Sequence, residues 1–166
     1  MTMPNSETKL EIQTLDYTKD ILISAPIEIT WDAVLAELGP EGEMPSEDGK
    51  TSKPYPFVFE PWPGGRWYRD LGDKTGHLWG HVQVIKPPKL LEIFGPCYMS
   101  YPATNHIQYR LTAEGDGTRL QITNRAFGYM PKDFMVGVEI GWEHGLKRIG
   151  EIAARMLKNT RTGTSK

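Results

Sequence analysis

The sequence predicts a single α+β domain, in which a strand and a helix lead into an antiparallel sheet and a long helix closes the fold. In the middle of the chain, short segments with strand-like composition follow one another between turn residues, as in an antiparallel meander. Before and after this region, apolar residues recur at helical spacing instead. The length of 166 residues suits one domain of this kind.

The first predicted elements are a strand over residues 17–24 and a helix. Pro26 suits the first turn of a helix. Gly39 and Pro40 end the helix, and the polar segment 41–53 predicts an exposed loop. One apolar helix face is formed by Ile27, Trp31, Val34, Leu35 and Leu38.

The meander consists of short segments separated by glycine- and proline-containing turns. Its predicted strands cover residues 55–60, 66–71, 75–86, 89–94, 105–113 and 118–127. A two-residue turn at Asp116 and Gly117 would pair the last two strands so that Tyr109 faces Asn124. Both side chains, together with Asn105, then lie on the inner face of the sheet.

The last helix follows Pro131, and about 20 residues would make it about 30 Å long, enough to cross the sheet. Its apolar positions are Val138, Trp142, Leu146, Ile149, Ala153 and Met156. Gly137, Gly141 and Gly145 recur every four residues. Close helix packing is the favoured interpretation, because glycine inside a helix usually has a packing reason; room for a ligand is the alternative.

Composition and charge exclude several classes of protein. The formal net charge of −2 does not favour a broad electrostatic grip on nucleic acid. The single cysteine excludes an intrachain disulfide and a cysteine-cluster metal site. Residues 1–10 lack the apolar stretch of a signal peptide, and no apolar run approaches the ~20 residues that span a bilayer. We therefore expect a cytoplasmic protein without membrane insertion.

Three parts of the chain are expected to differ in order. Residues 1–16 form an N-terminal extension, residues 17–157 form the folded domain, and residues 158–166 form a flexible C-terminal tail.

Several motifs occur in the order of a known superfamily. They are ISAP at 23–26 with WDA at 31–33, FEPWPGGRW at 59–67, GHV at 80–82 with PPKL at 87–90, GTRL at 117–120, and GW at 141–142 with Leu146. Together they resemble the START-like (SRPBCC) superfamily. The branch they resemble most contains homologues of the activator of the heat-shock-protein-90 ATPase and is close to the polyketide cyclases.

The resemblance implies a helix-grip fold, as in the birch-pollen allergen. A curved antiparallel sheet of about six to seven strands would wrap around the long C-terminal helix. In many members of the superfamily, an apolar cavity between sheet and helix takes small hydrophobic molecules.

No catalytic or metal constellation emerges from the residues. His77 and His81 would lie about 13 Å apart along a strand, too far to share one metal ion. We interpret both, and His144, as surface or hydrogen-bonded side chains, and expect no metal or cofactor. Cys97 is interpreted as an inert small hydrophobe. Glu60 and Arg66 flank the Pro-Gly-Gly turn and predict a salt bridge at the rim.

Aromatic and inward polar side chains predict the ligand site. Two inward asparagines suit a cavity with a few convergent polar groups better than a solid core. The candidate ligand-binding residues are Trp62, Trp67, Trp79, Tyr98, Asn105, Tyr109, Asn124, Phe127 and Trp142.

The predicted function is binding of a small hydrophobic ligand, aromatic or lipid-like, between the sheet and the last helix. Alternatives are a co-chaperone-type interaction module, a polyketide cyclase- or dehydratase-like enzyme, and a structural homodimer with a vestigial cavity. In the enzyme alternative Tyr109 would polarise a carbonyl and Asn124 would orient Tyr109. The sequence leaves open whether any reaction is catalysed and whether a chaperone partner exists.

Overall fold

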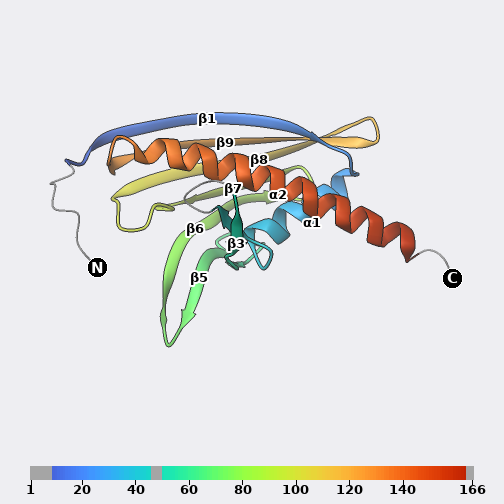
Figure 1. Cartoon of the computed structure of the whole chain (residues 1–166), viewed down its shortest axis with the longest axis horizontal. Coiled ribbons are helices and arrows are strands. Elements are labelled where there is room, and N and C mark those ends of the chain that lie inside the picture. Colours follow the sequence, from blue (N-terminus) through green and yellow to red (C-terminus); the bar gives the residue numbers. More distant parts are fainter. Residues whose placement is uncertain (1–8, 46–49, 164–166) are drawn as a thin grey trace.

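The computed structural model describes residues 9–45 and 50–163. One face of a seven-stranded antiparallel sheet, with strand order β1-β9-β8-β7-β6-β5-β4, carries the long helix α2 and the shorter helix α1 (Figure 1). The elements are β1 Glu11–Ile23, α1 Ile27–Leu38, β2 Glu43–Pro45, β3 Ser52–Pro54, β4 Val58–Phe59, β5 Arg66–Gly72, β6 Thr75–Lys86, β7 Leu90–Gly95, β8 Ala103–Glu114, β9 Gly117–Met130 and α2 Phe134–Thr162. The predicted helix-grip arrangement is confirmed.

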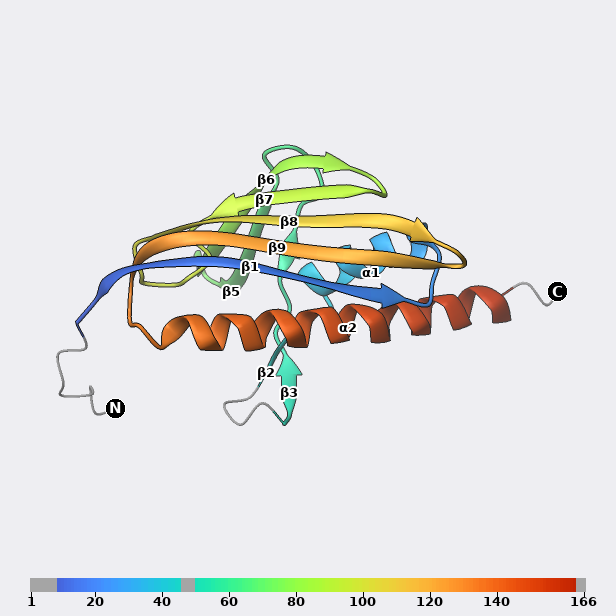
Figure 2. The same ribbon diagram turned by 90° about the horizontal axis from the view of Figure 1, so that it is seen from above.

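The sheet curves around the helices. Strands β5 and β6 turn away from the direction of β1 and β9 (Figure 1), and α2 runs alongside β1 over most of that strand's length (Figure 2). The curvature leaves space between the sheet and the first half of α2, and the site described below lies there.

Both outer elements are longer than the sequence predicted. Strand β1 begins at Glu11 rather than at residue 17, because it pairs with β9 along its whole length, from Glu11 opposite Met130 to Ile23 opposite Thr118. Helix α2 has 29 residues and continues to Thr162, so residues 158–162 are helical rather than part of a tail. Residues 1–8 of the predicted extension and 164–166 of the predicted tail lie outside the described residues.

The segment predicted as an exposed loop contains a small hairpin instead. Strands β2 and β3 pair antiparallel, with Met44 opposite Lys53, and the Ser52 hydroxyl donates a 2.6 Å hydrogen bond to the Glu43 carboxylate. Residues 46–49 of this segment lie outside the described residues. The strand predicted over 55–60 is shorter than expected and covers only Val58–Phe59.

The β8–β9 hairpin shows why the faces of strands are easier to predict than their register. The turn lies at Gly115 and Asp116, where Gly115 adopts a φ of +59°, so Tyr109 pairs with Ile122 and not with Asn124. The predicted register is therefore two residues out. Because side chains alternate with a period of two, Tyr109, Asn124 and Asn105 still lie on the inner face.

The two helices bury different parts of their surfaces. Helix α1 buries Trp31, Ala33, Val34 and Leu38. Helix α2 buries only a segment in its middle, whose buried residues are Gly145, Leu146, Ile149, Ile152 and Ala153. The helices contact each other, so the closed end of the fold is a conventional apolar core.

Trp67 connects this core to the sheet. Its indole Nε1 donates a 2.8 Å hydrogen bond to the carbonyl of Leu38, at the C-terminal end of α1. The last carbonyls of a helix have no partner within the helix, so this buried bond satisfies one of them. The Trp67 ring therefore fixes the position where α1 ends against β5.

We expect Trp67→Phe to reduce the free energy of unfolding by about 1–3 kcal/mol, because it leaves the Leu38 carbonyl buried without its donor. Urea unfolding measures the loss. Trp62→Phe is the matched control: Trp62 is 54% exposed, and its replacement should change stability by less than about 0.5 kcal/mol. Equal effects of the two substitutions would contradict the anchoring role of Trp67.

Candidate functional site

A cavity of about 570 Å³ lies between the sheet, the end of α1, the β2 segment and the first half of α2. Its lining is mostly apolar and aromatic. The lining residues are Glu37, Leu38, Glu43, Met44, Phe57, Trp67, Trp79, Cys97, Tyr98, Met99, Tyr101, Ile107, Tyr109, Pro131, Asp133, Phe134, Gly137, Val138, Gly141, Trp142 and Gly145.

Aromatic rings in contact form two parts of the wall. Phe57, Trp67 and Trp79 form one cluster, with ring centroids 5.3–5.8 Å apart. Across the cavity, Tyr109 from the sheet meets Trp142 from α2 edge to face at 6.5 Å. Rings held by mutual contact form a preorganised apolar surface rather than a collapsible one.

Two glycines of α2 keep the cavity open. A Cβ added at Gly137 or Gly141 would meet nothing within 4 Å, and both residues line the cavity. The close packing favoured from the sequence is therefore wrong at these two positions, and the alternative of open space fits. At Gly145, in contrast, an added Cβ would lie 3.3 Å from Oε1 of Glu37, so the absence of a side chain there admits the carboxyl group.

The inward asparagines lie behind the wall rather than on it. Asn124 Oδ1 accepts hydrogen bonds from the Tyr98 hydroxyl at 3.2 Å and from Trp142 Nε1 at 3.0 Å. Its Nδ2 donates to Asn105 Oδ1 at 3.0 Å, and Asn105 Nδ2 donates to the carbonyl of Pro96 at 3.1 Å. The protein itself satisfies both amides, and Asn124 orients two rings that do line the cavity.

Glu37 is the polar residue that sequence reasoning missed. Burial raises its pKa to about 8; the charge of Glu43 adds to the rise and Arg148 opposes it. Its carboxyl has no hydrogen-bond or ion-pair partner in the described part of the chain. A sequence signal was present, since Glu37 follows Ala33 by four residues and Val34 by three, which places it on the buried face of α1.

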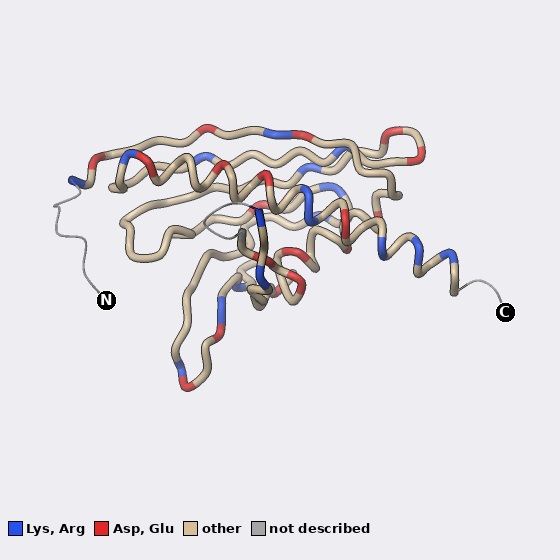
Figure 3. The backbone as a smooth tube through the Cα atoms, in the orientation of Figure 1, with Lys and Arg blue, Asp and Glu red and all other residues tan. Residues whose placement is uncertain are grey.

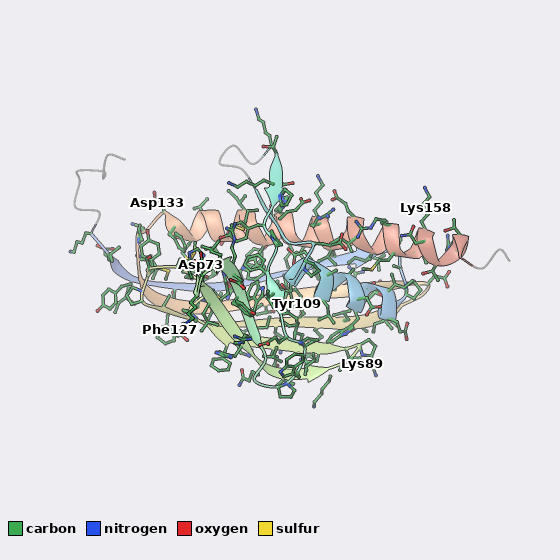
Figure 4. The ribbon with its side chains drawn as sticks, turned by 90° about the horizontal axis from the view of Figure 1, so that it is seen from below. Asp73, Lys89, Tyr109, Phe127, Asp133 and Lys158 are labelled. Atoms are coloured by element: carbon green, nitrogen blue, oxygen red, sulfur yellow. The ribbon has the colours of Figure 1, made fainter. Side chains whose placement is uncertain are left out.

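Tyr109 presents a second polar group to the same cavity. The residue is only 1% exposed, and Figure 4 shows it near the middle of the molecule. Burial raises the pKa of its hydroxyl well above the ordinary value, and the nearby charge of Glu37 adds to this. Within the described residues, the Tyr109 hydroxyl has no hydrogen-bond partner.

Two predicted site residues lie elsewhere. Trp62 is in the Pro-Gly-Gly turn and is 54% exposed. Phe127 is 60% exposed, because strand alternation turns it outward next to the inward Ala126, and it lies toward the edge of the sheet in Figure 4. Of the other predicted site residues, five line the cavity, namely Trp67, Trp79, Tyr98, Tyr109 and Trp142.

Two further candidates for chemistry, the Glu60–Arg66 pair and Cys97, are accounted for by local contacts. Arg66 Nε lies 2.7 Å from Glu60 Oε1, which confirms the predicted salt bridge, and hydrogen bonds from Arg66 lower the pKa of Glu60 to about 2. The Cys97 thiol contacts the carbonyl of Trp79 at 3.2 Å, and burial raises its pKa to about 12, as suits an unreactive thiol.

The cavity end near β2 carries a network of charges. Figure 3 shows basic residues along the second half of α2 and acidic residues close to its middle. Arg148 lies 3.4 Å from Glu43 and 3.7 Å from Glu41, while His144 Nε2 lies 3.8 Å from Glu43. Arg155 also binds Glu41. The positive charge of Arg148 is therefore divided among several carboxylates.

Among residues 9–45 and 50–163, no group of three or more His, Cys, Asp or Glu side chains is placed to hold a metal ion. No helix in those ranges combines the length and apolarity needed to cross a membrane.

A curved sheet that grips a long helix over an apolar cavity defines the helix-grip class, so the START-like resemblance is confirmed in the fold. No family model and no curated protein matches the sequence. Among solved structures, CalU16 from Micromonospora echinospora aligns with a TM-score of 0.57 and 19% identity, over 91% of this chain and 88% of CalU16. Mll3558 from Rhizobium loti aligns with a TM-score of 0.61 and 19% identity, over 86% and 99% of the two chains.

A further similar structure is DynU16, described as a protein of the dynemicin biosynthetic locus. It aligns with a TM-score of 0.53 and 15% identity, over 82% of this chain and 46% of DynU16. All three likenesses show a shared fold.

Replacing the central asparagine should destabilise the fold. Asn124→Leu leaves the Tyr98 hydroxyl, the Trp142 indole and the Asn105 amide without their shared partner, and we expect a loss of about 2–4 kcal/mol in urea unfolding. The neighbouring Arg125→Leu removes only an exposed ion pair with Asp16 and should change stability by less than about 0.5 kcal/mol. A tolerated Asn124→Leu would show that the network is not structural.

Glu37 should also make stability depend on pH. The pKa of Glu37 is about 8 in the folded protein against an ordinary value of 4.5, so its contribution to stability is complete below about pH 4.5 and is lost as the pH rises through 8. Wild type should therefore lose stability relative to Glu37→Gln over this interval in urea unfolding. Glu28→Gln, at the exposed start of α1, should follow wild type. Parallel pH profiles for wild type and Glu37→Gln would show that Glu37 ionises normally.

Proposed function

We propose that this protein binds a small, largely apolar molecule in the cavity between the sheet and the first half of α2. The observation that carries the proposal is the pair Gly137 and Gly141, which line a cavity that no neighbouring side chain fills. Each glycine costs a helix about 1 kcal/mol relative to alanine. Two such glycines border a space that no neighbouring atom approaches, and this supports a cavity that a ligand occupies.

The size and walls of the cavity indicate the class of ligand. A volume of about 570 Å³ lies within the range typical of small-molecule sites, about 300–1,000 Å³. The Phe57, Trp67 and Trp79 cluster and the Tyr109–Trp142 pair offer ring faces and edges from two sides. Such walls favour a ligand with rings over a flexible chain alone.

A second candidate function is chemistry on that ligand, of the cyclase or dehydratase type. It is supported by the likeness in fold to DynU16, from a biosynthetic locus, and by the unpartnered hydroxyl of Tyr109 in the cavity. In this function Tyr109 would polarise a carbonyl, and Tyr109→Phe would abolish turnover while ligand binding persists.

Binding is tested with the neutral fluorophore N-phenyl-1-naphthylamine on the full chain. Gly141→Leu should weaken binding by about tenfold or more, because its side chain enters the open space. Gly150→Leu is the matched control: Gly150 lies on the same helix, an added Cβ there also meets nothing, and it does not line the cavity. It should bind the fluorophore as wild type does.

Equal binding by wild type and Gly141→Leu would contradict the proposal. Native mass spectrometry of the purified protein, before and after organic extraction, would then show whether any molecule co-purifies. Stimulation of a purified heat-shock ATPase, unaffected by Gly141→Leu, would instead support the co-chaperone alternative, which acts through a surface and not through the cavity.

A further inference from the structure

Several polar groups on the cavity wall have no partner within the described residues, and they include the Glu37 carboxyl, the Tyr109 hydroxyl and the indole Nε1 of Trp79. Resting on the proposed function, we propose that the Glu37 carboxylic acid and the Tyr109 hydroxyl form a pair of hydrogen-bond donors that binds a carbonyl oxygen of an uncharged ligand. The ligand class is then a ring-containing ketone, aldehyde or lactone that fits the cavity.

The placement of the two groups supports a shared target. Glu37 comes from the last turn of α1 and Tyr109 from the middle of β8, yet both line the same cavity. They are close enough for the charge of Glu37 to raise the pKa of Tyr109. Gly145 on α2 admits the Glu37 carboxyl, because any Cβ there would press on Oε1 at 3.3 Å.

The neighbouring amides show that the protein satisfies other polar groups on this face of the sheet. Asn124 and Asn105, on the same inner face, are satisfied by Tyr98, Trp142 and the carbonyl of Pro96. Glu37 and Tyr109 have no such partner in the described residues. Buried polar groups are normally paired, so a group left unpaired beside a cavity calls for a partner that enters the cavity.

The charges around Glu37 favour its neutral form. Arg148 and His144 face this region from α2, Glu43 from β2 and Tyr109 from β8, with Glu41 just beyond the end of α1. Arg148 alone opposes protonation, and it is shared between Glu41 and Glu43. Burial therefore dominates, and at neutral pH Glu37 presents an O–H donor, as Tyr109 does.

The lining favours an uncharged ligand. Its ionisable groups include the carboxyl groups of Glu37, Glu43 and Asp133, whereas no lysine or arginine is among the lining residues. An anionic ligand would meet no cation on the wall. A cationic ligand bound beside Glu37 and Tyr109 would require an ionised Glu37, which burial disfavours. A carbonyl oxygen has two lone pairs and can accept from both donors at once.

The experiment compares two matched naphthalenes on the full chain. The ketone probe is 6-propionyl-2-dimethylaminonaphthalene, and the control is 6-propyl-2-dimethylaminonaphthalene, which lacks the carbonyl. At about pH 6.5, wild type should bind the ketone about tenfold more tightly than the control. As the pH rises through 8, this preference should fall several-fold, because ionised Glu37 no longer donates and only the Tyr109 hydroxyl remains as a donor.

Two variants isolate the roles of the donors. Glu37→Gln keeps an N–H donor but cannot ionise, so it should retain the ketone preference, now independent of pH. Tyr109→Phe should reduce the preference several-fold at every pH without affecting the control probe. Both variants leave the shape of the cavity nearly unchanged, and the wild-type pH series needs no variant.

The outcomes separate this inference from the proposed function. Equal binding of the two probes at about pH 6.5 would overturn the donor pair while leaving the cavity as a binding site. A ketone preference that does not change with pH in wild type would overturn the role of Glu37. Binding of neither probe would overturn the proposed function and this inference together. Binding of octylammonium that tightens as the pH rises would replace the carbonyl site with a cation site.

Discussion

The packing of the middle of α2 is the constraint on which the rest of the structure depends. Leu146, Ile149, Ile152 and Ala153 bury the helix against the core and fix its direction. The preceding part of the helix extends over the sheet and is held there by side chains, through the hydrogen bond of Trp142 to Asn124 and the ring contact of Phe134 with Tyr98. Gly137 and Gly141 lie between these contacts and contribute no side chain to the space beneath. The cavity therefore lies where the helix is held away from the sheet by a few large side chains.

The polar groups of the interior divide into two kinds, and this division links the fold to the site. Asn124 is fully bonded and immobilises the rings of Tyr98 and Trp142, so it maintains the shape of the wall. Glu37 and Tyr109 face the same space without partners. Satisfied amides specify a unique packing, whereas the unsatisfied donors are the groups through which we propose that the cavity selects its ligand.

The fold could be predicted from the sequence because helical spacing, turn residues and strand alternation are local signals that tolerate small errors in register. The β8–β9 register was two residues out, yet period-two alternation kept Tyr109 and Asn124 on the inner face. The site was harder to predict because it depends on which inward residues meet across elements. Strand alternation alone could have excluded Phe127 from the site, because it turns that side chain outward. The position of Asn124 behind the cavity wall could not be predicted, because its hydrogen-bond partners come from segments that are distant in the sequence. Glu37 was missed because a charged residue near a helix end usually faces solvent.

The β2–β3 segment shows how a peripheral element can control the chemistry of a buried one. The sequence predicted this segment as an exposed loop with no role in the site. In the structure it is a hairpin that brings Glu43 and Met44 to the cavity wall. Glu43 acts on Glu37 twice, since its own charge raises the pKa of that carboxyl and it also draws on the charge of Arg148. Arg148 itself contacts Glu41 and Glu151 as well as Glu43, so its opposing effect on Glu37 is shared among three carboxylates. The electrostatic environment of the buried carboxyl thus includes a residue of a short surface hairpin.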